Sequence, residues 1–118
     1  MGEFILTLLH AVTNTHILHF RANTFAEHET LGEFYSSLSD LIDTLTEAMQ
    51  GRTDTKIDFP VQYYPPADTA IDELMMLRDY LDAERSGPEI PQNSEIQNLI
   101  DEITAKIDST LNKLKNYK

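Results

Sequence analysis

Four residues in the first half of the chain, His16, His28, Asp43 and Glu47, are of types that bind metal ions. Neutral imidazoles and carboxylates suit iron, zinc and manganese, so the ligand types alone do not select the metal. Successive members of the set are separated by 12, 15 and 4 residues. The last interval places Asp43 and Glu47 one turn apart on the same face of a helix. The four residues therefore predict a metal site, provided that the fold brings them together.

Two predicted helices carry these residues, one over 3–21 and one over 24–50. Apolar residues recur at helical spacing in both segments, which is the main signal for a helix. Thr24 with Glu27 forms a capping-box pattern, which predicts the start of the second helix. Gly51 follows the last apolar position and predicts its end.

The predicted hairpin sets the distances between the four candidate ligands. His16 and His28 would both lie about 8–10 Å from the turn, where they could face each other. Asp43 and Glu47 would lie about 22–28 Å farther along the second helix. Because a metal ion lies about 2 Å from each ligand, one chain cannot bring all four residues to one ion.

A two-chain arrangement resolves this distance. If two chains pack antiparallel about a two-fold axis, the histidines of one can meet Asp43 and Glu47 of the other. The two carboxylates lie off the apolar stripe of their helix, on a flank that a partner could reach. The spacing therefore predicts a homodimer with two identical inter-subunit sites.

Two further helices are predicted in the second half, over 67–85 and 95–116. Ser94 with Gln97 is a second capping-box pattern and predicts the start of the last helix. Residues 52–66 contain three prolines, which exclude a continuous helix. When extended, this segment could span the full length of a bundle or form a loose loop, and the sequence leaves both open. Its Tyr63-Tyr64-Pro65-Pro66 run could pack on the bundle or serve as an aromatic recognition patch.

Helical spacing also predicts which side chains form the core. In the first helix the stripe comprises Phe4, Leu8, Val12, His16 and Phe20, widened by Ile5, Leu9 and His19. In the second it comprises Leu31, Phe34, Tyr35, Leu38, Ile42, Leu45 and Met49. The last two helices contribute Ala70, Leu74, Leu77 and Leu81, then Ile96, Ile100, Ile103, Ile107, Leu111 and Leu114. Together these stripes predict a single all-α domain over 1–118, folded as a four-helix bundle.

The composition of the chain excludes or disfavours several kinds of protein and binding site. With 118 residues, of which 41% are hydrophobic, the chain can bury one core. Its net charge of −11 disfavours nucleic-acid binding. The absence of cysteine excludes disulfides and thiolate metal sites. The start of the chain lacks a basic segment, and there is no apolar run of about 18 residues, so we expect neither a signal peptide nor a membrane span. We expect a cytoplasmic location.

The same stretch resembles a known family. Thr15, His16, Phe25, His28, Glu29 and Leu31, followed by Asp43 and Glu47, resemble the pattern of Dps, the mini-ferritin that oxidises and stores iron. The resemblance covers about 40 residues. It implies a ferritin-like bundle with a long crossover between the second and third helices, assembled as a two-fold dimer or a larger shell. It also implies an inter-subunit iron site, with His16 and His28 from one subunit, Asp43 and Glu47 from its mate, and no catalytic residue beyond these ligands.

The chain departs from that family at several positions. Dps has a carboxylate four residues after the second histidine, where this chain has Gly32, and a tryptophan where this chain has Ile17. Dps also has a lysine-rich tail that is missing here, so the resemblance does not imply that this chain binds DNA. The loss of a ligand at Gly32 predicts weaker affinity and leaves ferroxidase activity open.

A second interpretation is therefore kept. Small proteins of this kind are similar to reading frames of tailed phages, which would place the protein in a host cytoplasm or a virion. Such a protein could be a non-catalytic interaction or assembly protein that kept the scaffold and a degenerate metal site. His16 and His28 would then be packed histidines, and Asp43 and Glu47 part of a solvated acidic face. His19 could be an extra ligand or pack at the turn.

Overall fold

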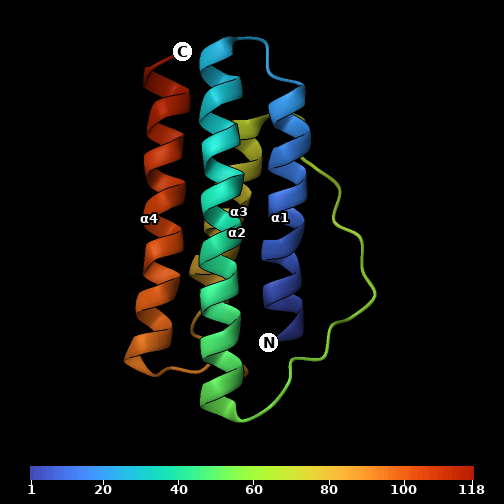
Figure 1. Ribbon diagram of the computed structural model, residues 1–118, viewed down its shortest axis with the longest axis vertical. Helices are drawn as coiled ribbons and strands as arrows, with labels where there is room; N and C mark the ends of the chain where they lie inside the picture. Colours follow the sequence, from blue (N-terminus) through green and yellow to red (C-terminus); the bar gives the residue numbers. More distant parts are fainter.

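The computed structural model describes all 118 residues as four helices with no strand (Figure 1). The helices are α1 (Gly2–Phe20), α2 (Phe25–Thr53), α3 (Ala70–Glu84) and α4 (Ser94–Asn116). α1 and α2 form one antiparallel hairpin, and α3 and α4 form another. The prediction of an all-α protein with four helices is therefore confirmed.

A long crossover, residues 54–69, joins the two hairpins. It leaves the lower end of α2, runs along the outside of α1 and reaches α3 at the opposite end of the bundle (Figure 1). α3 therefore runs parallel to α2 and antiparallel to α1. Of the two alternatives that the sequence left open, the segment that spans the bundle is the correct one. It is held at its start by Ile57, which is buried and donates its N–H to Gln50 Oε1 at 2.9 Å.

The core is one cluster of 23 buried hydrophobic residues drawn from all four helices and the connections. The predicted apolar positions of α3 and α4 are all buried, as are those of α2 except the half-buried Tyr35. The outer faces carry the charged residues, and none of the helices has the length and apolarity needed to cross a bilayer.

The predicted stripe of α1 was partly wrong. Its buried positions are Phe4, Ile5, Leu8, Ala11, Asn14, Thr15 and Leu18, whereas Phe20 is 72% exposed and Leu9 is also exposed. Residues four apart advance by 400°, so a stripe built only on steps of four turns by about 40° at each step. The buried face instead follows mixed steps of three and four, and the end of the predicted stripe rotates into solvent.

One predicted helix boundary, the start of α2, is confirmed, and others are wrong. Thr24 caps α2 as predicted, its Oγ1 accepting the N–H of Glu27 at 3.1 Å. Gly51 does not end α2; the helix continues to Thr53, and Asp54 (φ 52°) adopts the left-handed conformation that terminates it. α3 begins three residues later than predicted, because Thr69 caps it by accepting the N–H of Asp72.

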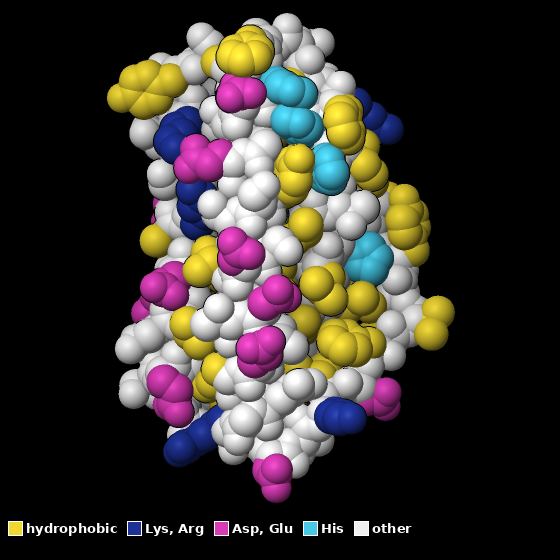
Figure 2. Space-filling model, viewed as in Figure 1, with side chains coloured by type: hydrophobic (Ala, Val, Ile, Leu, Met, Phe, Trp, Pro, Cys, Tyr) yellow, Lys and Arg dark blue, Asp and Glu magenta, His cyan; other side chains and the backbone are white.

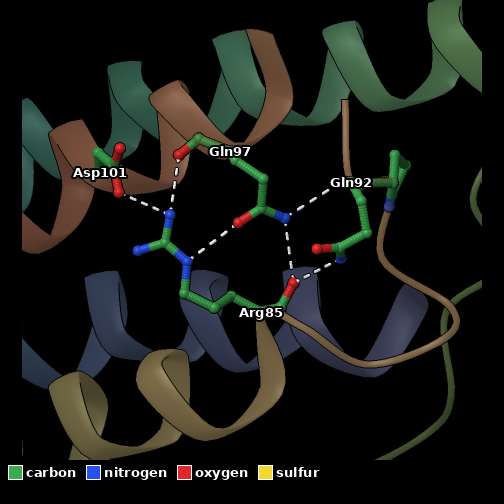
Figure 3. A network of polar contacts seen from close by, with 5 residues as sticks. Arg85, Gln92, Gln97 and Asp101 are labelled. Atoms are coloured by element: carbon green, nitrogen blue, oxygen red, sulfur yellow. Dashed lines mark hydrogen bonds and ion pairs between the residues drawn. The ribbon is translucent and has the colours of Figure 1, made fainter. Parts of the chain in front are cut away.

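The predicted capping box at Ser94 was also wrong. Asn93 is the N-cap residue of α4 and Ser94 is already helical. The Gln97 side chain instead faces Arg85 at the end of α3, where Arg85 Nε donates to Gln97 Oε1 at 3.0 Å (Figure 3). The same guanidinium donates to Asp101 Oδ1 at 2.6 Å, and Gln92 Nε2 donates to the Arg85 carbonyl at 2.8 Å. This network joins the end of α3 to the start of α4.

Candidate metal centre

Three histidines meet at the turn between α1 and α2 and are called the histidine cluster: His16, His19 and His28. Figure 2 shows histidine side chains gathered near this end of the molecule. The rings of His19 and His28 stack with centroids 3.7 Å apart and planes inclined by 18°. The ring of His16 lies 6.0 Å from that of His19. The hairpin therefore brings the two predicted histidines to one place, but the ring that faces His28 is that of His19.

Two reciprocal hydrogen bonds fix the stacked pair. His28 Nδ1 lies 2.9 Å from the carbonyl oxygen of His19, and His19 Nδ1 lies 2.6 Å from the carbonyl oxygen of His28. A carbonyl oxygen can only accept, so each Nδ1 must carry the proton and donate it. In the neutral rings each Nε2 then holds a lone pair. Metal-binding histidines are oriented in this way, with the other ring nitrogen held by a carbonyl or carboxylate.

Gly32 makes room for the histidine cluster. A Cβ atom at this position would lie 3.0 Å from His19 Cε1 and 3.2 Å from His19 Nδ1. These distances are shorter than ordinary van der Waals contacts, so a larger residue would displace the His19 ring. A glycine inside a helix costs about 1 kcal/mol relative to alanine. The close approach of His19 gives this glycine a structural reason within the single chain.

Glu33, the carboxylate next to Gly32, is directed away from the histidines. Its Oε1 lies 2.9 Å from Lys106 Nζ and its Oε2 lies 3.5 Å from Lys113 Nζ, both on α4. The hydrogen bond and charge of Lys106, helped by Lys113, hold the pKa of Glu33 below its ordinary value. Glu33 therefore offers no carboxylate to the histidine cluster.

His16 lies beside the stacked pair among aromatic rings. It stacks on Tyr35 with centroids 4.1 Å apart and on Phe20 with centroids 5.0 Å apart. Its ring nitrogens make no hydrogen bond within the chain, in contrast to those of His19 and His28. His16 is half-buried, so its ring is still reachable from the surface.

Asp43 and Glu47 lie far from the histidine cluster. Both are exposed on α2, and neither forms an ion pair. At 1.5 Å per residue they are about 22–28 Å along the helix from His28. Figure 2 shows acidic side chains along the whole length of this face, some beside the histidines and others near the opposite end. No group of three or more histidine, aspartate and glutamate side chains in the chain could hold one metal ion. The predicted ligands can share an ion only if a second chain contributes.

Comparison with known proteins identifies one family. A family of unknown function, DUF5856, matches residues 19–114. The matched range includes His28, Asp43 and Glu47 and begins three residues after His16. No curated protein and no solved structure matches the chain. Because the match covers most of the chain, this protein belongs to the DUF5856 family of unknown function.

Proposed function

We propose that this protein is a ferritin-like bundle of the Dps type that binds iron, or another divalent metal, between two subunits. His16 and His28 of one chain are the proposed ligands, together with Asp43 and Glu47 of a second chain. The observation that carries the proposal is the position of two histidines from different helices at one turn, with His28 Nε2 free to bind.

The connectivity supports the ferritin-like part of the proposal. Two antiparallel hairpins are joined by one long crossover, so that α2 and α3 are parallel (Figure 1). Bundles of the ferritin class use a single long crossover, whereas up-and-down bundles use only short loops. In that class, metal sites are built from side chains on the helices, as proposed here.

Apart from His28, the proposed metal ligands have no hydrogen-bonded partner in their own chain, which supports the inter-subunit site. His16 makes no hydrogen bond through its ring nitrogens, and neither Asp43 nor Glu47 has a cationic partner in its own chain. In an antiparallel pair of α2 helices that brings these groups together, the two-fold axis would pass near Ser36 and Ser37. Ser36 is exposed, and small side chains at the crossing let two helices approach closely.

The donor set suits a divalent cation. Two neutral imidazoles and two carboxylates offset the charge of Fe(II) and leave coordination positions open. Iron is the substrate in this proposal, and dioxygen or peroxide is the oxidant. His19 has a separate role, because its carbonyl oxygen holds the Nδ1 proton of His28 and thereby keeps Nε2 available.

Anaerobic calorimetric titration with Fe(II) tests the proposal directly. We expect saturable binding of one ion per chain in a dimer or larger assembly, followed by ferric absorbance when oxygen is admitted. Asp43→Asn should abolish binding without loss of helicity. Asp82→Asn, the same charge change at an exposed position on α3, should not affect it. If Asp43→Asn binds as tightly as the parent, the site assignment is wrong.

A non-catalytic interaction or assembly protein on the same scaffold is the second candidate. The tight stacks of His16 on Tyr35 and of His19 on His28 favour it, because packed structural histidines make such contacts. In this case the titration would show no Fe(II) binding by a folded assembly, and the three histidines would stabilise the hairpin only.

A further inference from the structure

A groove bordered by α1, α3 and the crossover has no role in the proposed metal site. It has a volume of about 260 Å³. His10 and Asn14 line it from α1, Tyr80 and Glu73 from α3, and Tyr64 from the crossover. Its size is slightly below that of drug-sized ligand pockets, so it suits a small molecule.

Aromatic rings from three parts of the chain form the walls of this groove. The rings of His10 and Tyr64 are nearly perpendicular, at 85°, with centroids 5.1 Å apart. Tyr80, across the groove on α3, packs against Phe4 with centroids 6.1 Å apart. In the contact of His10 with Tyr64 the edge of one ring meets the face of the other, and both Tyr64 and Tyr80 line the groove. An aromatic face that borders such a space attracts a cation.

The crossover wall is held in place by polar contacts. The Asn14 side chain, only 4% exposed, donates from Nδ2 to the carbonyl oxygen of Tyr64 at 3.1 Å. At the end of the crossover, Glu73 Oε1 accepts the N–H of Ala67 at 2.9 Å. A buried amide is costly unless it is hydrogen-bonded, so the Asn14 contact fixes the crossover to α1. The groove is therefore a built feature of the fold.

The charges around the groove are of one sign. Glu3 and Glu73 line it, and no lysine or arginine does. Arg78, the arginine of α3, is directed to Asp108 on α4. Burial, and to a smaller extent the carboxylates of Glu3 and Glu84, raises the pKa of the Tyr80 phenol. An anionic ligand would be repelled here and a cation attracted.

We infer that this groove binds a small organic cation whose alkylated ammonium group lies against Tyr64 and Tyr80, with Glu73 providing the opposite charge. The apolar walls accept the alkyl groups, and the ring faces accept the positive charge. Glu73 uses one carboxylate oxygen for Ala67, which leaves the other for the cation. This site is independent of the proposed metal centre, since it shares no residue with it.

Titration with choline, followed by amide chemical shifts and calorimetry, tests this inference. We expect saturable shifts in α1, α3 and the crossover. The neutral isostere 3,3-dimethylbutan-1-ol should bind much more weakly, because it has the same shape without the charge. Tyr64→Leu and Tyr80→Leu should each weaken choline binding by about 2- to 30-fold. Glu73→Gln keeps the acceptor for Ala67 but removes the charge, and it should weaken binding and reduce its salt dependence.

Matched variants make the test decisive. Tyr117→Leu repeats the aromatic substitution at an exposed residue outside the groove, and Glu102→Gln repeats the charge change on α4. Both should bind choline like the parent. The inference is overturned if the folded parent shows no saturable binding, or if the neutral isostere binds equally well. It is also overturned if the control variants weaken binding as much as the groove variants do.

Discussion

The imidazole of His19 occupies the space in which a side chain at Gly32 would begin. The ring lies 3.0 Å from the position of the missing Cβ, and it stacks on His28 at 3.7 Å. The absence of a side chain at Gly32 thus lets the His19 ring of α1 lie against α2 and stack on His28. The same glycine is one of the positions at which the sequence departs from the Dps pattern that it resembles.

A double-mutant cycle on this pair measures the contact. Gly32→Ala in the His19→Ala background should stabilise the protein by about 1 kcal/mol, because alanine favours the helix and no ring is displaced. In the parent background the gain should be lost or reversed, since the new Cβ would push the His19 ring. Urea unfolding of the four proteins gives the coupling energy. An equal gain in stability in both backgrounds would show that a Cβ atom at position 32 does not displace the His19 ring.

The Glu33–Lys106 pair should contribute to stability in a pH-dependent way. The folded-state pKa of Glu33 lies below its ordinary value of 4.5, chiefly because Lys106 donates a hydrogen bond to it. A depressed pKa adds stability above the unfolded-state pKa, and this stability is lost as the pH falls through the folded-state value. The carboxylate is exposed, so we expect about 0–1 kcal/mol, reduced by salt.

Glu33→Gln tests this contribution. The variant should be less stable than the parent at neutral pH and equal to it in acid, where the parent carboxylate is protonated. Urea unfolding at both pH values is the measurement, and Glu29→Gln, an exposed carboxylate without an ion pair, is the control. A stability difference that persists unchanged in acid would rule out the ion pair as its source.

His28→Ala should remove the protection that a divalent metal gives against heat. A ligand that binds only the folded state stabilises it by about 2.7 kcal/mol at 100 times its dissociation constant. The parent should therefore melt at a higher temperature with added Mn(II) or Zn(II) than without. Differential scanning calorimetry of the parent and of His28→Ala, each with and without the metal, measures the change in melting temperature. His10→Ala, which lies on α1 outside the histidine cluster, should keep the metal-induced rise in melting temperature.

Arg85→Met should destabilise the bundle more than Arg78→Met. Arg85 donates to the Gln97 side chain, the Gln97 carbonyl and Asp101 (Figure 3). Its loss removes the donor from the two partly buried Gln97 oxygens and from the exposed Asp101 carboxylate. We expect a cost of about 1–3 kcal/mol. Arg78 forms only one surface ion pair, with Asp108, worth about 0–1 kcal/mol. Equal losses in chemical denaturation would mean that the network adds nothing beyond one ion pair.

Local signals predicted some helix ends and not others. Thr24 caps α2 because its side chain reaches an N–H three residues away, a contact that depends on neighbouring residues only. Ser94 and Gln97 carry the same local pattern, but Gln97 is recruited by Arg85, 12 residues away. At Gly51 the helix simply continues, because nothing in the fold requires the chain to turn there. The pattern was correct only where no distant residue competed for the side chain.

The sequence by itself determined the four helices, most of their buried faces and the location of His16 and His28 on either side of one turn. These features follow from helical periodicity and from the short link between α1 and α2. Only the tertiary structure decided that His19 stacks on His28 over Gly32 and that Tyr64 faces His10. Those contacts join separate segments, and they depend on the rotation of each helix about its axis and on the path of the crossover. Periodicity gives neither, because it describes one segment at a time.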